Sequence, residues 1–507
     1  MLRAFRESFK HTSIYTIGNL AGKAVGFIMI PIYTHFLAPH EYGVMDMLDL
    51  TIVLIGMLVG MGMGSAIFRF YYSSEVDRDR QEVIGSALWF SAAITGLVAL
   101  VVAALARPAS SLIFRSPIYA HFLQIAILAF WLSTLAETCK TYLRVKQRSV
   151  FFVTVSLVQL ALSLSLNIYL IAFRRMGVMG FLLSSVISNT VIAAALMLYT
   201  VSEVGLHFSM TKTRQMLDYG LPFVFSGIGL FVLNFADRYF LNAFAGLDAV
   251  GVYALAYKFG FTINVLAVAP FLQMWQAQMF LIERERDAKE TYVRMFEYFA
   301  AFILLAVLAV SLFIEYILKI AAGPEYFSAY ALVPLVALAY VFSGWAQYFR
   351  LGMLLTRRTR PIATIMAGTG VVTLALYWVL IRRYHAMGAA VATVLSFALM
   401  AAWTFIVSQR IYPIPYRPRR IAALVGGAAL CYAVPWIAHG VVGDKPIYDL
   451  LLRSVALAGY PLLLIQGGFF ANDGVRRIRE LPGGIRRLLS RSPKAPAEPE
   501  PAGDLLP

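Results

Sequence analysis

The chain has 507 residues, of which 60% are hydrophobic and only 14% are charged, and its mean hydropathy is +0.73. Soluble domains carry roughly 25% charged residues, so this composition excludes a water-soluble globular protein. The net charge of +16 does not indicate a nucleic-acid partner, because most Lys and Arg residues lie in short strips between apolar blocks. Both cysteines lie inside apolar blocks, which excludes a disulfide framework and a thiolate metal cluster.

The apolar blocks recur along the whole chain and have the length of membrane spans. With about 20 residues per span, we expect an all-α integral membrane protein with about fourteen transmembrane helices. The first block follows a basic start but is longer than the apolar part of a signal peptide, so we expect an uncleaved span. The positive-inside rule places both termini in the cytoplasm, because the strips on that side hold most of the basic residues. The expected spans start near residues 13, 43, 82, 118, 150, 177, 217, 249, 291, 328, 362, 387, 420 and 448.

An internal repeat links the two halves of the chain. Residues 174–188 (RRMGVMGFLLSSVIS) resemble residues 382–396 (RRYHAMGAAVATVLS), and the same offset of 208 aligns Gly43 with Gly251. An even number of spans separates the copies, so the repeat is parallel. The predicted organisation is a six-helix lobe at 1–208, a second at 209–410, two additional helices at 411–470, and a basic, then Pro-rich cytoplasmic tail at 471–507.

The cations inside predicted spans include Lys23 in the first, Arg238 in the seventh and Lys258 in the eighth. A charge that faces lipid costs at least about 2.5 kcal/mol, so we expect these cations to face a cavity or one another. Lys23 shares a helix face with Asn19, a pattern typical of a cavity wall. Asp237 leaves two interpretations open: it neutralises Arg238 or Lys258 as a buried pair, or the cations remain available for an anionic substrate. The excess of cations favours the second.

Other polar residues within the spans form two sets. The acidic set would supply counter-ions or a coupling site for a proton or sodium gradient, and it consists of Asp46, Asp49 and Asp237. The second set suits a polar cavity lining and equally suits hydrogen bonds between helices; it consists of Asn19, Gln159, Asn167, Asn234, Gln347 and Arg350. The spacing of Gly56, Gly60 and Gly64 predicts close helix packing, with a bending point as the alternative.

Motifs for catalysis are missing from the sequence. The D-x-D at Asp77–Asp79 lies in a charged loop, no phosphate-binding G-x-x-x-x-G-K-[ST] loop occurs, and the seven histidines are scattered. Loops on the outer side are short, the longest being RPASSLIFRSP. We therefore predict no enzyme, no catalytic residue, no metal site and no cofactor.

Four stretches together resemble a known family: PIYTHFLAPHEYG at 31–43, LRVKQRS at 143–149, ADRYFLNAFAGLDAVGVYALAYKFG at 236–260 and AAGPEYFSAYALVPLVAL at 321–338. They resemble the polysaccharide-exporter branch, with its Wzx-type O-antigen flippases, of the multidrug, oligosaccharidyl-lipid and polysaccharide (MOP) exporter superfamily. The resemblance runs from about residue 8 to residue 410.

The resemblance implies two six-helix lobes around a central cavity in the bacterial inner membrane. It also implies alternating access that moves an undecaprenyl-diphosphate-linked oligosaccharide from the cytoplasmic to the outer leaflet. Lys23 and the Asp237–Arg238 pair would line or brace the cavity. The implied partners are the lipid-linked oligosaccharide, membrane lipids and other polysaccharide-assembly proteins, with no nucleic acid. Two alternatives stay open, a drug/cation antiporter of the same superfamily and a membrane polysaccharide polymerase.

Overall fold

The computed structural model describes residues 26–442, 446–467 and 469, so Asn19 and Lys23 lie outside the described residues. The described part is helical throughout and contains no β-strand, as the composition predicted. Helices suit a membrane because they satisfy their backbone hydrogen bonds within each segment. A helix at Gly26–Phe36 comes first. It is followed by α2 Pro39–Gly60, α3 Met63–Ser73, α4 Asp77–Ala104, α5 Ala106–Phe114, η1 Pro117–Tyr119, α6 Ala120–Val145, α7 Ser149–Asn167, η2 Ile168–Phe173, α8 Gly177–Val204, α9 Met210–Phe235, α10 Asp237–Ile263, η3 Asn264–Val268, α11 Ala269–Ile282, α12 Ala288–Ala321, η4 Pro324–Ala331, α13 Val333–Phe349, α14 Leu351–Leu355, α15 Arg360–Ile411, α16 Pro418–Val442 and α17 Pro446–Gln466.

By length and composition, ten segments among the described residues can cross a membrane, or eleven with the bent pair of η4 and α13. Two of these segments, Gly227–Gln276 and Arg360–Ile411, have 50 and 52 residues. At 1.5 Å per residue each would be about 75 Å long, more than twice the hydrocarbon thickness. Each is broken by a residue with positive φ, Gly246 at 83° and His385 at 48°, so each holds more than one crossing. The multi-pass membrane fold is confirmed, and the number fourteen stays a prediction.

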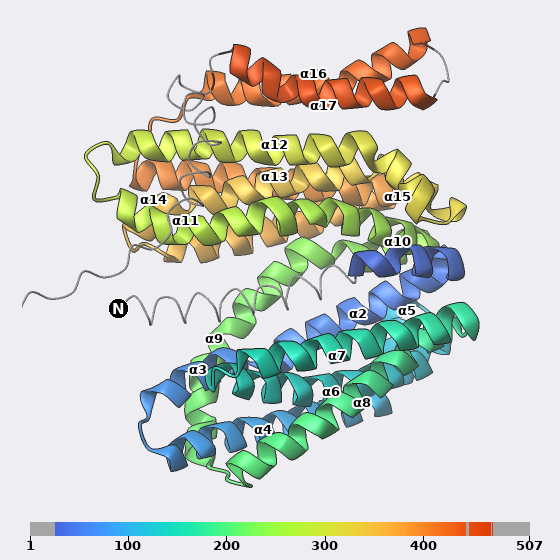
Figure 1. Cartoon of the computed structure of the whole chain (residues 1–507), viewed down its shortest axis with the longest axis vertical. Coiled ribbons are helices and arrows are strands. Elements are labelled where there is room, and N and C mark those ends of the chain that lie inside the picture. The colour runs from blue at the N-terminus through green and yellow to red at the C-terminus, as the bar shows by residue number, and fades with distance from the viewer. Residues whose placement is uncertain (1–25, 443–445, 468, 470–507) are drawn as a thin grey trace, which may run out of the picture. The chain divides into compact units, whose positions relative to one another are not determined.

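The helices up to Tyr416 form one compact unit, which contains two groups of helices (Figure 1). In the first group, α2 to α8, helix α6 packs against α4 and α8; in the second, α10 to α15, helix α15 packs against α10 and α13. Helix α9 contacts α2, α3 and α4 of the first group and α10 and α15 of the second. A second unit begins at Arg417, where α16 packs against α17. The predicted boundaries at 208 and 410 stay predictions.

The two groups meet where α2 crosses α10 with backbone against backbone. A Cβ atom on Gly43 would lie 2.1 Å from the carbonyl oxygen of Leu247, and one on Gly251 would lie 1.9 Å from the carbonyl oxygen of Pro39. His40 and Asp248, whose side chains lie 3.4 Å apart at the same crossing, are 208 residues apart. These reciprocal contacts follow the offset of the predicted repeat, although the repeat over the whole chain stays a prediction.

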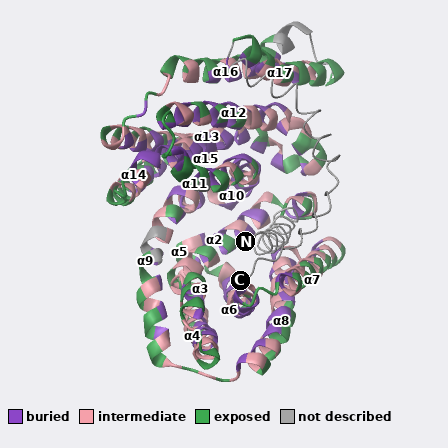
Figure 2. Ribbon diagram, turned by 60° about the vertical axis from the view of Figure 1, so that its left-hand side comes forward, coloured by how far each residue is buried: buried purple, intermediate pink, exposed green. Residues whose placement is uncertain are grey.

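Burial differs between the two groups, as Figure 2 shows by the purple residues of α13 and α15. Each span contains an apolar stretch of 18 residues. Half of the residues in that stretch are buried in Gly227–Gln276 and in Ala288–Ala321, but only 22% are buried in Asp77–Ala104 and 11% in Ser149–Phe173. Exposed apolar side chains on membrane helices face lipid without cost. The second group therefore has the denser protein interior.

Two stretches differ from the main expectation about local structure. Gly56 packs closely, since a Cβ atom there would lie 3.2 Å from the Phe130 ring, but a Cβ atom on Gly60 or Gly64 would have no neighbour within 4 Å. The alternative of a bending point holds between these two glycines, where α2 ends because Met61 and Gly62 adopt positive φ values of 42° and 62°. The stretch RPASSLIFRSP, expected as a loop, contains helix α5, whose Ser110 Oγ donates a hydrogen bond to the Ser116 carbonyl oxygen at 2.6 Å.

Candidate functional site

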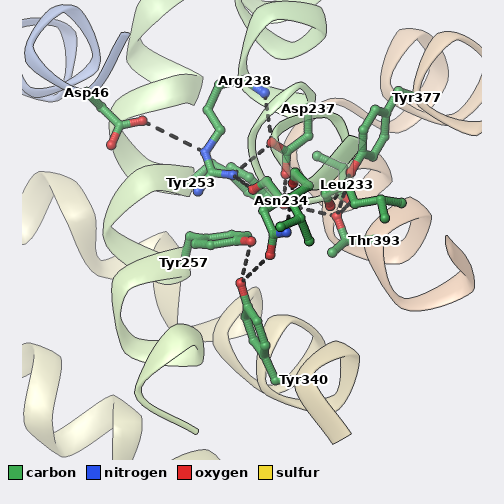
Figure 3. Close-up of polar contacts among 12 residues, drawn as sticks. Asp46, Leu233, Asn234, Asp237, Arg238, Tyr253, Tyr257, Tyr340, Tyr377 and Thr393 are labelled. Carbon is green, nitrogen blue, oxygen red and sulfur yellow. Dashed lines mark hydrogen bonds and ion pairs between the residues drawn. The ribbon is translucent and has the colours of Figure 1, made fainter. Parts of the chain in front are cut away.

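A buried ion-pair cluster begins at the start of α10, where Asp237 and Arg238 are 0% and 2% exposed. Arg238 Nη1 donates to Asp237 Oδ1 and to the Asn234 carbonyl oxygen, both at 2.8 Å. Arg238 Nε lies 3.8 Å from Asp46 Oδ2, and the guanidinium carbon lies 3.7 Å from the centroid of the Tyr257 ring (Figure 3). In this conformation the guanidinium is enclosed by protein groups.

The other oxygen of Asp237 ties the cluster to α15. Tyr253 Oη donates to Asp237 Oδ2 at 2.7 Å, and Tyr253 and Tyr377 each lie 3.5 Å from the hydroxyl of Thr393 (Figure 3). A buried carboxylate with both oxygens engaged is a structural anchor, because removal of either charge leaves the other unpaired in a medium of low dielectric constant. The interpretation of Asp237 and Arg238 as a buried pair therefore describes this conformation.

Lys258 extends from α10 toward α2. Its Nζ atom lies 5.0 Å from the ring centroid of Tyr42 and interacts electrostatically with Asp46 and Asp49. Asp49 is exposed, whereas Asp46 is mostly enclosed. Among the described residues the cluster thus holds the carboxylates of Asp46, Asp49 and Asp237 against two cations. The predicted excess of cations counted Lys23 as well, which lies outside the described residues, so it stays a prediction.

A polar cavity of about 340 Å³ lies in the second group, next to this cluster. Asn234 and Tyr340 belong to both, since Tyr340 Oη lies 3.4 Å from Asn234 Oδ1 and 2.5 Å from Tyr257 Oη. Apolar side chains make up about half of the lining, and the hydroxyls of Tyr340 and Ser343 also reach it. The rest of the polar lining is five carboxamides and one guanidinium, from Asn234, Asn264, Gln273, Gln276, Gln347 and Arg350. We call this space the amide cavity.

A local break in α-helical geometry positions several of these amides. The segment η3, Asn264–Val268, is a π-helix, and Pro270 follows it in the first turn of α11. Proline lacks the N–H group that would continue the α-helical ladder, and π-helical turns recur at functional sites. Asn264 therefore lines the cavity at the break, and Gln273 and Gln276, three residues apart on α11, line it beyond the break.

The first group holds a cavity of the same volume with different chemistry. It is lined by hydroxyl side chains such as Ser133 and Thr134, by the open glycines Gly60 and Gly64, and by Glu137 and Arg144. Arg144 Nη2 donates to Glu137 Oε1 at 2.9 Å, so the two charges of this cavity are paired with each other.

The predicted polar stripe of the first group does not reach either cavity. Gln159 accepts a hydrogen bond from Lys140 Nζ at 2.5 Å and donates to Asn189 Oδ1 at 3.0 Å, which joins α7 to α6 and α8. Asn167 donates to the Ser163 carbonyl oxygen of its own helix at 2.9 Å. In this conformation Gln159 forms hydrogen bonds between helices, and Asn167 forms one within its own helix.

The structure thus brings the predicted residues into two places. The ion-pair cluster, called the charged cluster below, contains Asp46, Asp49, Asp237, Arg238 and Lys258. The amide cavity is lined by Asn234, Gln347 and Arg350. Sequence reasoning missed Gln273 and Gln276, although QMWQAQ within an apolar block was a detectable signal. The described residues contain no group of three or more His, Cys, Asp or Glu side chains that could hold a metal ion.

Comparison with known proteins assigns the fold and the family. The model of a family described as polysaccharide biosynthesis protein matches residues 8–275. The fold is similar to that of the lipid II flippase MurJ in its inward closed conformation, with a TM-score of 0.72 and 10% identity over 92% of this chain and 99% of that one. No curated protein matches by sequence.

Multidrug transporters share the fold as well. An inward-facing MATE family transporter of the MOP superfamily has a TM-score of 0.61 and 17% identity, covering 81% of this chain and 95% of that chain. A mutant of the Vibrio cholerae MATE transporter VcmN has a TM-score of 0.54 and 17% identity, covering 80% and 96%. At these identities the likeness shows the fold alone, which is that of membrane transporters and flippases.

Proposed function

The chain belongs to the polysaccharide biosynthesis protein family, in the polysaccharide-exporter branch of the MOP superfamily, and on that premise we propose that it flips a polyprenyl-diphosphate-linked oligosaccharide across the bacterial inner membrane. The observation that carries the proposal is the amide cavity. Carboxamides both donate and accept hydrogen bonds, as sugar hydroxyls do, so a cavity lined by five of them suits a glycan better than an apolar drug.

Alternating access is the proposed mechanism, and the crossing of α2 and α10 is its closed gate. With both termini in the cytoplasm, the loops at this crossing lie on the outer side, and the glycine contacts hold the two groups together there. Opening the outer side requires α2 and α10 to part. The glycan would then move from the cytoplasmic to the outer mouth while the polyprenyl tail stays in lipid.

Lys23 and Lys258 remain the proposed contacts for the diphosphate, with Arg238 as a brace that holds α10 in place. A coupling proton or sodium ion would act at Asp49, because Asp46 and Asp237 already face Arg238. The liposome assay described next contains this protein alone, so it tests whether flipping requires other assembly proteins.

The test is flipping by the purified protein in liposomes that contain a fluorescent lipid-linked oligosaccharide. We expect the fraction of lipid that an external reagent can reach to rise with the protein, and deletion of the gene in its host to accumulate the lipid-linked intermediate on the cytoplasmic face. Efflux of cationic dyes without lipid flipping would instead support the drug/cation antiporter, which the exposed carboxylate of Asp49 favours. Polymer formation by the protein alone would support a polymerase.

A further inference from the structure

We infer that Arg350 and the amide side chains around it form an oxyanion-binding subsite that reads a charged group on the transported lipid-linked glycan. The inference rests on the proposed function and adds to it the kind of chemical group that the amide cavity binds. The anionic group is a phosphate of the carrier or a carboxylate on a sugar. A guanidinium recognises both by two parallel N–H···O bonds.

Arg350 differs from the other cations buried among the described membrane helices. Lys140 lies 3.8 Å from Glu137, and Arg238 lies 2.8 Å from Asp237. Lys258 interacts electrostatically with Asp46 and Asp49. Arg350 has no carboxylate within ion-pair distance in the part of the chain that the structure describes, yet it lines a cavity inside the protein. A cation there without a counter-charge favours an anionic ligand from outside the chain.

The amides beside Arg350 are free to bind a ligand. The side chains of Asn264, Gln273 and Gln276 make no hydrogen bond to any described residue, and Gln347 makes one weak contact of 3.5 Å within its own helix. Amides that joined helices would form hydrogen bonds to neighbouring helices, as Gln159 does in the first group. The polar stripe of the second group is therefore a binding surface.

The polar lining of the cavity extends along one helix. One face of α13 and its C-cap lines the cavity through Tyr340, Ser343, Gln347 and Arg350. Ten residues at 1.5 Å each make this face about 15 Å long. Arg350 stands at the end nearer the basic strip RRTR, and Tyr340 stands at the end that touches the charged cluster. A volume of 340 Å³ equals the share of roughly eleven waters in the liquid, which is room for a sugar ring with its bound water.

The experiment measures binding of three probes to the purified full-length protein in nanodiscs. The probes are undecaprenyl diphosphate, a lipid-free disaccharide that contains a hexuronate, and the matching neutral disaccharide. We expect Arg350→Gln to weaken one anionic probe by roughly tenfold to a hundredfold, with Arg350→Lys intermediate and the neutral probe unchanged. Weaker binding of undecaprenyl diphosphate assigns the subsite to the carrier phosphate. Weaker binding of the hexuronate disaccharide assigns it to an acidic sugar.

Matched controls separate the subsite from general effects. Arg358→Gln removes the same charge from an exposed position outside the cavity and should change no affinity. Gln276→Leu should weaken the disaccharides, whereas Gln278→Leu, on the same helix but outside the lining, should not. If Arg350→Gln does not fold, Arg350→Lys still tests the guanidinium of the subsite, because it keeps the charge and removes the paired N–H donors; the two glutamine variants test the amides.

Unchanged affinity for both anions in Arg350→Gln, or an equal loss for all three probes, would overturn the inference. The liposome assay keeps the proposed function separate. A wild-type protein that flips no lipid-linked glycan contradicts that function, whereas equal flipping by wild type and Arg350→Gln contradicts only the subsite.

Discussion

The two helical groups contain cavities of equal volume, but their polar side chains are used differently. In the first group Gln159, Lys140 and Asn189 satisfy one another between helices, and the cavity charges Glu137 and Arg144 form a pair. In the second group the side chains of Asn264, Gln273 and Gln276 make no hydrogen bond to any described residue, and Arg350 has no acidic partner among the described residues. A polar residue in a membrane helix thus indicates binding only when no neighbouring helix has already used its hydrogen bonds.

The interface between the groups is the most costly place to disturb. Asp237→Ala should leave Arg238 buried without its closest partner and destabilise the fold by about 3–5 kcal/mol. The measurement is thermal unfolding in detergent, followed by size-exclusion chromatography. Replacing both residues by Leu should cost less than Asp237→Ala alone. A double variant that is as unstable as the single one would contradict the assignment of the pair as a structural anchor.

The crossing of α2 and α10 tests whether the two groups are equivalent there. Gly43→Ala and Gly251→Ala should each force the backbones apart, at a cost of about 1–3 kcal/mol, because each new methyl group meets a carbonyl oxygen. Thermal unfolding and lipid flipping should fall to a similar extent in both. Gly60→Ala is the matched control, since its methyl group would meet nothing within 4 Å. Unequal effects of the two substitutions would argue against a symmetric crossing.

Substituting one glutamine in each group tests the contrast between the two polar stripes. Gln159→Leu should lower thermal stability by about 1–3 kcal/mol, because it removes the hydrogen bonds of Lys140 and Asn189 in the protein interior. Flipping per folded molecule should stay the same. Gln276→Leu should do the reverse, with normal stability and slower flipping. If Gln159→Leu slows flipping at normal stability, the first group also binds substrate.

The smallest effect is expected at the surface of the same crossing. His40 Nδ1 lies 3.4 Å from Asp248 Oδ2, but these side chains are 43% and 72% exposed. Exposed ion pairs contribute only about 0–1 kcal/mol, so Asp248→Asn should shift the unfolding temperature little and less than Gly251→Ala does. A larger shift in unfolding temperatures measured at low salt would assign the pair a role in holding the two groups together.

The sequence by itself determined the fold class, the family and the position of most breaks between spans. Apolar length and basic strips act locally, so Gly246 and His385 break their helices between expected spans. The spacing of Gly43 and Gly251 predicted an equivalence that their mutual contact matches. Arg350, Asn234 and Gln347 were also predicted as a polar cavity lining within apolar spans, and all three line one cavity.

Only the tertiary structure decided which polar groups are free. Arg238 and Arg350 are both cations in apolar spans, and the sequence already places Asp237 beside Arg238. Only the fold brings Asp46 of α2 to Arg238 as well, and it brings no described acid to Arg350. Gln159 and Gln347 are equally polar, yet only Gln159 meets partners on two neighbouring helices. The physical reason is that hydrogen bonds and ion pairs depend on distances between helices far apart in the chain, which helical periodicity does not encode.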